Sequence, residues 1–299
     1  MGEEKKLMEK KSAYPRAIIL GIDGLEYSLV SEWKLKNIMQ KSYCKLDLSD
    51  YEVIVTPPIW GSMLTGKIDS EVMKIWIKHA EIAGGGINTK QKWWAKIVDL
   101  LPPKIDLWIW YHIFTPLIGG DPFEKTANYV LDKKQKNIFQ FFKNPWTNGI
   151  PGYGKQISNQ NDRYLLQNAM LGKDAPFKQI YYKIYDIDKQ SLLNTLDKNE
   201  YDLIFWYTTI VDKFGHVYMK KPLKLMDIYL EINQLVGTIL KNYSKSSIYL
   251  ISDHGMMLFR GFWGLHSNYG FFSSNTGELI KKPYDLYDLL IKQKQNKKF

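Results

Sequence analysis

Short apolar runs bounded by polar residues predict buried strands, and three such runs in this chain lead into an aspartate. They are "AIILGI" (17–22) before Asp23, "DLIFWYTTIV" (202–211) before Asp212, and "SIYLIS" (247–252) before Asp253. If these strands are parallel neighbours, their carboxyl ends lie along one edge of a sheet, where ligands bind in open α/β folds. We therefore expect the three carboxylates to converge.

The stretch between the second and third runs has the spacing of an amphipathic helix. Its apolar positions are 225, 228, 232, 235, 236, 239 and 240. This period is typical of a helix that covers one face of a sheet. A strand, a helix and another strand in this order predict an α/β fold with a mainly parallel central sheet.

Near the N-terminus, "IVTPPIWGSMLTGK" (54–67) changes character at Thr56. The apolar residues before it predict a strand that stops at Thr56, and Pro57 or Pro58 suits the first position of a helix. Thr56 would then be the N-cap. Taken alone, this pattern indicates nothing more than a capping threonine.

Histidines add nitrogen ligands to the converging carboxylates. The chain has five histidines, and three of them follow the predicted second and third strands: His216 in "DKFGH", His254 in "DHG" and His266 in "GLHSNYG". Asp and His side chains together form a mixed set that suits zinc or a similar divalent metal. Each motif alone is weak, but their combination in one α/β frame favours a metal site.

Size and composition are those of a globular protein. The chain has 299 residues, 45% of them hydrophobic, and its single cysteine, Cys44, allows no internal disulfide. We read Cys44 as a structural thiol and predict a reducing cytoplasm as the compartment. The start of the chain does not have the pattern of a secretory signal. The most apolar stretch, 105–120, is interrupted by polar residues and too short to span a membrane, so we expect a buried segment or a lid, with shallow membrane contact as the alternative.

The formal net charge of +10 indicates an anionic partner. Many of the lysines lie in the two ends of the chain, which favours solvated tails over a shaped nucleic-acid surface. The partner could be nucleic acid, an acidic membrane surface or a small anionic phosphorylated substrate, and charge alone does not choose among them. The sequence predicts no transmembrane segment and does not indicate an oligomeric state.

The ordered motifs "GIDG", "TPPIWGSMLTG", "DKFGH", "SDHGM" and a late histidine resemble those of the type I phosphodiesterase/nucleotide pyrophosphatase branch of the alkaline phosphatase superfamily. The resemblance covers roughly residues 17–66 and 200–270. It implies an alkaline-phosphatase-like core and two divalent metal ions, with zinc favoured and manganese or iron as alternatives. The implied ligands are Asp212, His216 and His266 for one ion, and Asp23, Asp253 and His254 for the other, with Thr56 as the nucleophile that bridges toward the second ion.

One departure from the family pattern concerns the phosphate contact. Family members often carry a His-Gly pair about a dozen residues after the nucleophile and an Asn beyond it, and this chain has neither in the same place. Asn88 is a distant candidate, so substrate-binding residues are left unassigned.

The predicted organisation is one catalytic domain, 13–285, with a cap inserted at about 84–200 and charged tails at 1–12 and 286–299. The cap range contains half of the ten tryptophans, Trp93, Trp94, Trp108, Trp110 and Trp146. Aromatic rings among lysines could stack on a base or sugar, although a tightly packed lid core is the better explanation of any single Trp.

The favoured function is hydrolysis of a phosphodiester or pyrophosphate bond through a covalent phosphothreonine. Within the same superfamily, the alternatives are a phosphomonoesterase, a phosphoglycerate mutase or a sulfatase. Thr56 argues against a sulfatase, and the chain length leaves little room for the second domain of a mutase. From another class, a basic nucleic-acid or membrane-binding protein with an inactive metal site stays open.

Overall fold

The computed structural model describes residues 17–83, 105, 135–153, 162–259 and 262–296. The strands in these ranges are β1 (Ala17–Ile22), β2 (Ser42–Asp47), β3 (Pro145–Thr147), β4 (Leu203–Thr208), β5 (Ser247–Ser252), β6 (Met256–Phe259), β7 (Trp263–His266) and β8 (Tyr269–Ser274). The helices are α2 (Tyr27–Glu32), α3 (Lys36–Met39), α4 (Thr56–Thr65), α5 (Ser70–Ala83), the short η2 (Ile138–Phe141), α10 (Asp162–Met170), α11 (Ala175–Lys198), α12 (Ile210–Tyr218), α13 (Leu223–Asn242) and α14 (Asp285–Asn296).

Six strands form the central sheet, in the order β2-β8-β5-β1-β4-β3, and β6 pairs with β7 in a separate hairpin. β1 lies between β4 and β5 and is parallel to both. β8 is antiparallel to its two neighbours, β2 and β5. The predicted fold class, α/β with a mainly parallel sheet flanked by helices, is confirmed.

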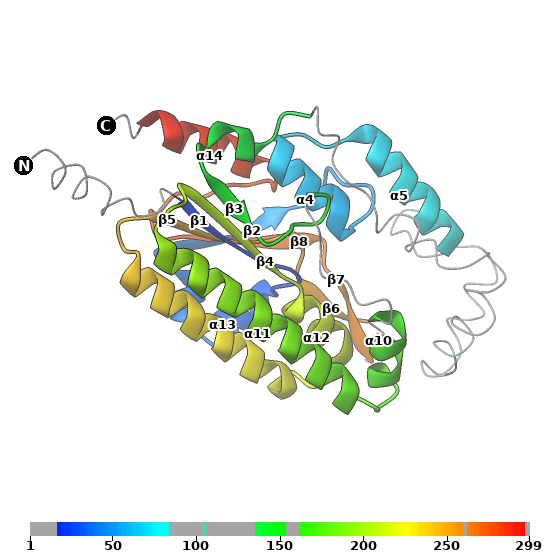
Figure 1. Cartoon of the computed structure of the whole chain (residues 1–299). Coiled ribbons are helices and arrows are strands. Elements are labelled where there is room, and N and C mark those ends of the chain that lie inside the picture. The colour runs from blue at the N-terminus through cyan, green and yellow to red at the C-terminus, as the bar shows by residue number, and fades with distance from the viewer. Residues whose placement is uncertain (1–16, 84–104, 106–134, 154–161, 260–261, 297–299) are drawn as a thin grey trace, which may run out of the picture.

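Helices cover both faces of the sheet (Figure 1), with α11, α12 and α13 on one face and α4, α5 and α14 on the other. The alternation of side chains along β1 explains the two layers. Ile18, Leu20 and Ile22 belong to the core under α11 and α13. Ala17 and Ile19 belong to the core that includes residues of α4 and α14. A strand buried on both faces reads as a continuous apolar run, which is why β1 was visible in the sequence.

The bounds of β1 and β5 agree with the prediction, but β4 is shorter than expected. It ends at Thr208, and Asp212 lies in the first turn of α12. The apolar residues after Thr208 follow a helical rather than an extended pattern, since Ile210, Val211 and Phe214 are all buried on one side of α12.

The expectation that Thr56 ends a strand and caps a helix is wrong. The segment before it is not a strand, Val55 is the N-cap, and Thr56 is the first residue of α4. Pro57 and Pro58 occupy the next two positions, where the fixed φ of proline is compatible with a helix. Prolines so close together also explain why no strand continues through this segment.

Residues 286–299 were expected to be a charged tail, and this is wrong as far as α14 extends. Leu286, Leu289 and Leu290 are buried against the core that contains α4. Their spacing is that of an amphipathic helix, which the surrounding lysines obscured.

The predicted cap, 84–200, is described only in part. Most of 84–134 lies outside the described residues, and so do Asn88 and every cap tryptophan except Trp146. Trp146 lies in β3, which pairs with β4, and α11 packs against β4. The later part of the range therefore contributes to the core, and the boundaries of the domain stay a prediction. No helix in the described ranges is both long enough and apolar enough to cross a membrane.

Candidate metal centre

The seven residues singled out in the sequence meet at one edge of the central sheet. Asp23 follows β1, and Asp253 and His254 follow β5. Parallel neighbours deliver these side chains to the same edge, as expected for an open α/β sheet. The remaining contributions come from α12 with Asp212 and His216, from the end of β7 with His266, and from the start of α4 with Thr56.

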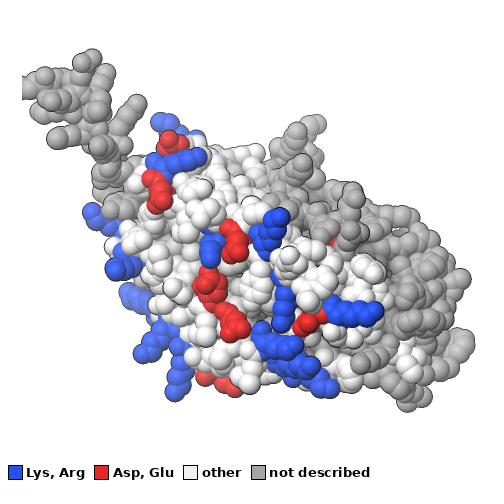
Figure 2. Space-filling model, turned by 60° about the horizontal axis from the view of Figure 1, so that its bottom comes forward, with Lys and Arg blue, Asp and Glu red and all other residues white. Residues whose placement is uncertain are grey.

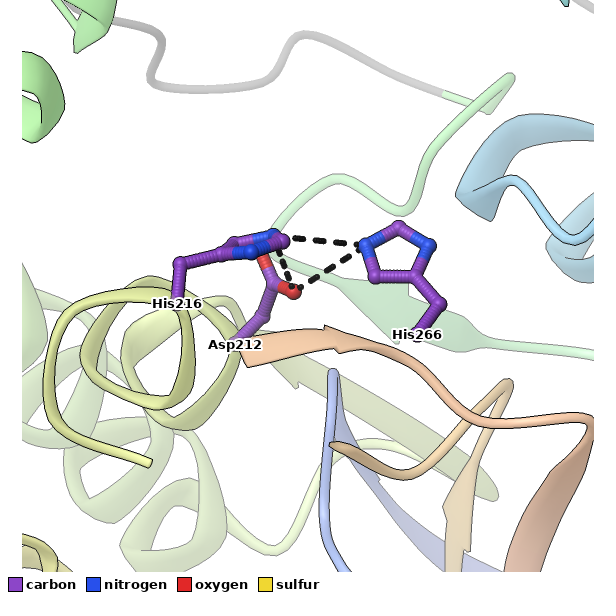
Figure 3. A group of neighbouring side chains, drawn as sticks. All are labelled: Asp212, His216 and His266. Carbon is purple, nitrogen blue, oxygen red and sulfur yellow. Dashed lines mark hydrogen bonds and ion pairs between the residues drawn. The ribbon is translucent and has the colours of Figure 1, made fainter. Parts of the chain in front are cut away.

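Asp212, His216 and His266 form one set, which we call the His216 group (Figure 3). Asp212 Oδ1 lies 3.2 Å from His216 Nε2 and 3.6 Å from His266 Nε2. The two Nε2 atoms are 3.3 Å apart. Because Asp212 and His216 are four residues apart in a helix, they point to the same side. Three donor atoms this close could hold one metal ion.

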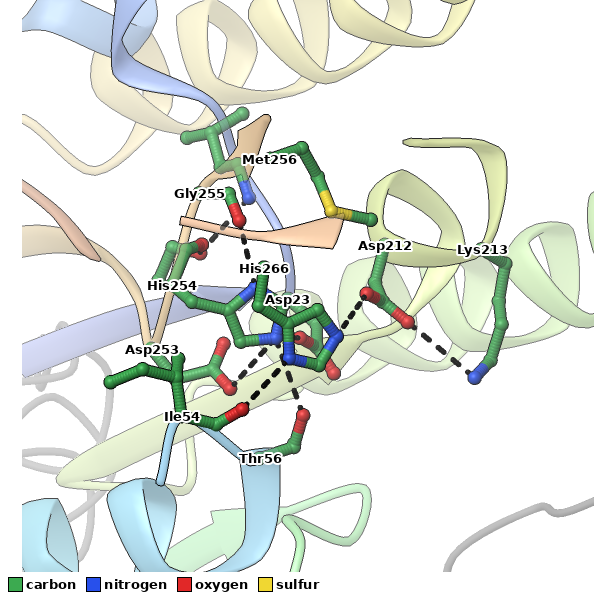
Figure 4. A network of polar contacts seen from close by, with 12 residues as sticks. Asp23, Ile54, Thr56, Asp212, Lys213, Asp253, His254, Gly255, Met256 and His266 are labelled. Atoms are coloured by element: carbon green, nitrogen blue, oxygen red, sulfur yellow. Dashed lines mark hydrogen bonds and ion pairs between the residues drawn. The ribbon is translucent and has the colours of Figure 1, made fainter. Parts of the chain in front are cut away.

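Asp23, Asp212 and His254 form the second set, the Asp23 group (Figure 4). His254 Nε2 lies 3.3 Å from Asp23 Oδ1 and 3.4 Å from Asp253 Oδ2. Thr56 Oγ1 is 3.4 Å from the same nitrogen. The structure therefore brings all predicted second-ion residues together and adds Asp212, which belongs to both groups.

The histidine rings are oriented by backbone carbonyls. His216 Nδ1 lies 2.8 Å from the Gly264 oxygen, His266 Nδ1 lies 3.1 Å from the Ile54 oxygen, and His254 Nδ1 lies 3.0 Å from its neighbour's oxygen. An Nδ1–H that donates to a carbonyl leaves the Nε2 lone pair for a metal. Burial, together with the adjacent His254, lowers the pKa of His266 to about 4, which favours the neutral form that metals require.

Several carboxylate oxygens in the centre are buried and accept no hydrogen bond from any described residue. They are Asp23 Oδ1, Asp212 Oδ1 and both oxygens of Asp253. Asp253 is fully buried. Buried oxygens without donors are costly unless a cation balances them. This chemistry fits divalent metal ions.

The charges of the three carboxylates act on one another. Burial, followed by the charges of Asp253 and Asp212, raises the pKa of Asp23 well above its ordinary value. Burial also raises the pKa of Asp253 to about 7. Burial acts in the same direction on Asp212, but attraction to His216 and Lys213 outweighs it and holds the pKa of Asp212 well below its usual range. A bound cation would relieve this repulsion.

Sequence reasoning missed three residues that support the centre. The Tyr207 hydroxyl donates to Asp23 Oδ2 at 2.6 Å, and Lys213 Nζ lies 3.5 Å from Asp212 Oδ2. Buried Glu26 accepts hydrogen bonds from the Met256 amide at 2.8 Å and the Tyr269 hydroxyl at 2.7 Å, which ties the segment after β1 to the segment after β5. Lys213 adjoins Asp212 in "DKFGH" and could have been noticed, whereas Tyr207 and Glu26 depend on contacts between distant segments.

Residues 89–262, more than half of the chain, match the family model of type I phosphodiesterase / nucleotide pyrophosphatase. The chain belongs to this family. It is therefore a hydrolase that acts on phosphoric ester bonds, and the resemblance drawn from the motifs is confirmed. Asp212, His216, Asp253 and His254 lie inside the matched range of the phosphodiesterase family, and Asp23, Thr56 and His266 lie outside it.

Solved structures that match this chain include the alkaline phosphatase from the Antarctic bacterium TAB5. That structure is 11% identical, with a TM-score of 0.43, and the match covers 95% of this chain and 99% of that chain. Murine ectonucleotide pyrophosphatase / phosphodiesterase 5 is also 11% identical, with a TM-score of 0.33, over 81% of this chain and 57% of that chain. No protein with a curated function matches the sequence.

Proposed function

We propose that this phosphodiesterase-family protein cleaves a phosphodiester or pyrophosphate bond of a small anionic molecule, with Thr56 as its nucleophile. The observation that carries the proposal is the position of the Thr56 hydroxyl. Its Oγ1 lies 3.4 Å from His254 Nε2, at the edge where the buried carboxylates converge. Val55 occupies the capping position, so capping does not explain the threonine.

The His216 group would hold one ion and the Asp23 group, with Asp253 and Thr56, the other. Zinc is favoured for this mixed nitrogen and oxygen set, and manganese or iron would also fit. When bound, the ions would polarise the phosphoryl oxygens and stabilise negative charge on the attacking and leaving oxygens.

The chemistry proceeds in two displacements at Thr56. First, Oγ1 forms a bond to phosphorus, the bond from phosphorus to the leaving oxygen breaks, and the hydroxyl proton is lost to solvent. Water then attacks the phosphothreonine, the Oγ1–phosphorus bond breaks, and the hydroxyl is restored. Splitting the reaction in this way replaces one difficult step by two easier ones.

The start of α4 favours an anion beside Thr56. Pro57 and Pro58 have no N–H and cannot donate a hydrogen bond. A phosphoryl oxygen at the first turn would therefore interact with the Thr56 amide and with the positive end of the helix dipole. A stiff first turn also limits the motion of the nucleophile, since proline fixes φ.

A cytoplasmic location remains our prediction, because the single cysteine cannot form an internal disulfide.

The decisive variant is Thr56→Ala, tested on metal-reconstituted protein with chromogenic phosphodiesters, monoesters and pyrophosphates. We expect folding and metal content to be kept and turnover to fall by at least about 100-fold, because the covalent route is lost. Thr56→Ser should retain much of the rate. Thr238→Ala is the matched control, since Thr238 lies on α13 and its hydroxyl bonds only to the Gln234 carbonyl within its own helix.

Acid quenching during turnover gives an independent measurement. The peptide containing "VTPPIW" should carry the phosphoryl half of the substrate in the wild type and not in Thr56→Ala. Near-normal turnover of Thr56→Ala with no adduct in the wild type would overturn the covalent mechanism. Cleavage of monoesters alone would show a phosphomonoesterase instead.

A further inference from the structure

The β6–β7 hairpin presents apolar side chains to solvent beside the metal centre. Met257 is 51% exposed, Leu258 43% and Leu265 39%. Met257 pairs with Leu265 across the hairpin, and Phe259 pairs with Trp263, so these four side chains share one face. Met256, Leu258 and His266 lie on the opposite face, where Met256 is buried and His266 is half-buried at the metal centre. A small hairpin with apolar residues on its outer face marks an interaction surface.

A basic turn lies against this hairpin. Lys220 and Lys221 are exposed and form no ion pair within the described part of the chain. Lys220 Nζ lies 4.1 Å from the centre of the Phe262 ring, which joins the turn to the hairpin. Leu223, the first residue of α13, directly follows the turn and is 75% exposed.

The turn is rigid rather than a loose loop. The Lys221 amide donates to the Tyr218 carbonyl at 2.6 Å, and the Lys224 amide donates to the Lys221 carbonyl at 2.8 Å. The hairpin is equally well fixed, because β7 contacts α12 so closely that a Cβ on Gly264 would lie 2.4 Å from the Gly215 oxygen. A preformed surface of this kind loses little conformational entropy on binding.

Charge identifies the partner. Neither 217–225 nor 255–266 contains an Asp or Glu. Asp174 of another segment pairs with Lys224, so the turn lysines left without an acidic partner among the described residues are Lys220 and Lys221. Figure 2 shows Lys and Arg side chains along the left and lower edges of the face seen in this view, and others near its middle, where acidic side chains lie among them. Exposed Leu and Met beside Lys is the composition of surfaces that insert shallowly into anionic membranes. A nucleic-acid site would need the lysines but not the exposed Met and Leu.

We propose that the β6–β7 hairpin and the segment Lys220–Leu223 form a docking surface for an anionic lipid bilayer. The apolar side chains enter the headgroup region, and the lysines stay at its charged surface. Because β7 ends at His266, a docked molecule holds its metal centre close to the bilayer. The docking itself needs neither metal nor turnover, so it is tested separately from the proposed hydrolysis.

The test is cosedimentation of the full chain with vesicles of phosphatidylcholine alone, or of about three parts phosphatidylcholine to one part phosphatidylglycerol. We expect binding to the anionic vesicles that weakens between about 0.1 M and about 0.5 M NaCl. Lys220→Gln with Lys221→Gln should weaken this binding by about 25-fold, since each lysine near an anionic surface contributes about fivefold. Met257→Gln with Leu265→Gln should weaken it at least about tenfold.

Matched controls lie at the other end of the sheet. Leu279 is 54% exposed in the segment after β8, and Lys241 is exposed near the end of α13. Leu279→Gln and Lys241→Gln should leave vesicle binding within about twofold of the wild type, since single exposed residues away from a binding surface contribute little. Equal losses in the controls and in the surface variants would overturn the proposal.

A second measurement detects a signal that appears on binding, so it does not depend on variants that bind vesicles less well. In a Cys44→Ser background, Met257→Cys labelled with an environment-sensitive fluorophore should shift to the blue with anionic vesicles, and Leu279→Cys should not. No shift at position 257, or no binding by folded wild type, would overturn the proposal. So would a dimer that Met257→Gln disrupts in the absence of vesicle binding, because the surface would then pair with a second copy.

Discussion

The Tyr207 hydroxyl donates a hydrogen bond of 2.6 Å to Asp23 Oδ2 inside the core. Tyr207 is itself held in place, because its amide donates to Asn148 Oδ1 at 2.8 Å and its carbonyl accepts from Asn148 Nδ2 at 2.7 Å. Its ring packs edge-on against Trp60. One oxygen of Asp23 is thus fixed by a donor, and the other, Oδ1, is left for a cation.

Removing this hydroxyl should loosen Asp23 and weaken metal binding. We expect Tyr207→Phe to keep the ring packing and to lower metal affinity by about 10- to 100-fold, as loss of an outer-shell partner does. Isothermal titration with zinc would measure the change. Tyr284→Phe is the matched control, because the Tyr284 hydroxyl bonds to Asp50 at the surface, at 2.8 Å. Equal affinity in Tyr207→Phe and wild type would show that Asp23 needs no such support.

Gly264→Ala should displace β7 and disturb the His216 group. The added Cβ would meet the Gly215 backbone, which cannot move aside as a side chain can, and the Gly264 carbonyl orients His216. We expect a loss of roughly 2 kcal/mol in the free energy of unfolding, together with weaker metal binding. Gly237→Ala is the contrast, because the three atoms nearest to its Cβ would all belong to the side chain of Asn37. Denaturant unfolding with and without metal separates the two effects.

Asp212 belongs to both groups, so its substitution should affect both ions, whereas substitution of a histidine should affect mainly one. Asp212→Asn should reduce binding of both ions, whereas His216→Ala should reduce one in preference. Elemental analysis after reconstitution gives the number of ions per chain. A chelator should lower the thermal midpoint of the wild type, because ions bound only by the folded state stabilise it. A folded wild type that binds no ion would contradict the metal centre.

A pH effect is expected at Asp188, away from the metal centre. Burial raises the pKa of this α11 carboxyl to about 6, and a hydrogen bond from Asn148 offsets burial in part. The folded state then binds a proton more tightly than the unfolded state, so this residue costs stability above about pH 6, and the cost disappears as the pH falls toward 4.

Asp188→Asn should therefore stabilise the protein at pH 7 to 8, by about 1 kcal/mol after allowance for partial solvent exposure. The gain should vanish near pH 4. Thermal unfolding across this range would measure it, with Asp197→Asn, an exposed position on the same helix, as the control. A gain that does not change with pH would show that burial of the charge is not the cause.

The sequence predicted those elements of the fold in which apolar residues follow a regular pattern. β1 and β5 are buried on both faces, and α13 has one apolar side, so their patterns were plain. The end of β4 and the start of α4 could not be predicted correctly. Apolar β-branched residues such as Ile210 and Val55 are compatible both with a strand and with the beginning of a helix. Helix α14 was missed because the segment was interpreted from its many lysines as a charged tail, and the helical spacing of its three buried leucines was not considered.

The candidate site could be foreseen to the extent that topology alone gathers residues at one edge. Asp23 and Asp253 follow parallel neighbours of the same sheet, so their approach follows from the fold. The double membership of Asp212 could not be foreseen, because it depends on its place in the first turn of α12. The hydrogen bonds of Tyr207 and Glu26 join residues about 180 to 240 positions apart, which no local pattern encodes.

The position of β1 in the sheet has a consequence for how the chain is made. β1 is synthesised first among the described strands, yet both of its neighbours, β4 and β5, begin only at residues 203 and 247. During translation its apolar residues have no partner strand until β4 has been made, which exposes an aggregation-prone segment. The last ligand, His266, emerges later still. Chains interrupted before that point therefore carry the first aspartate but cannot complete the His216 group.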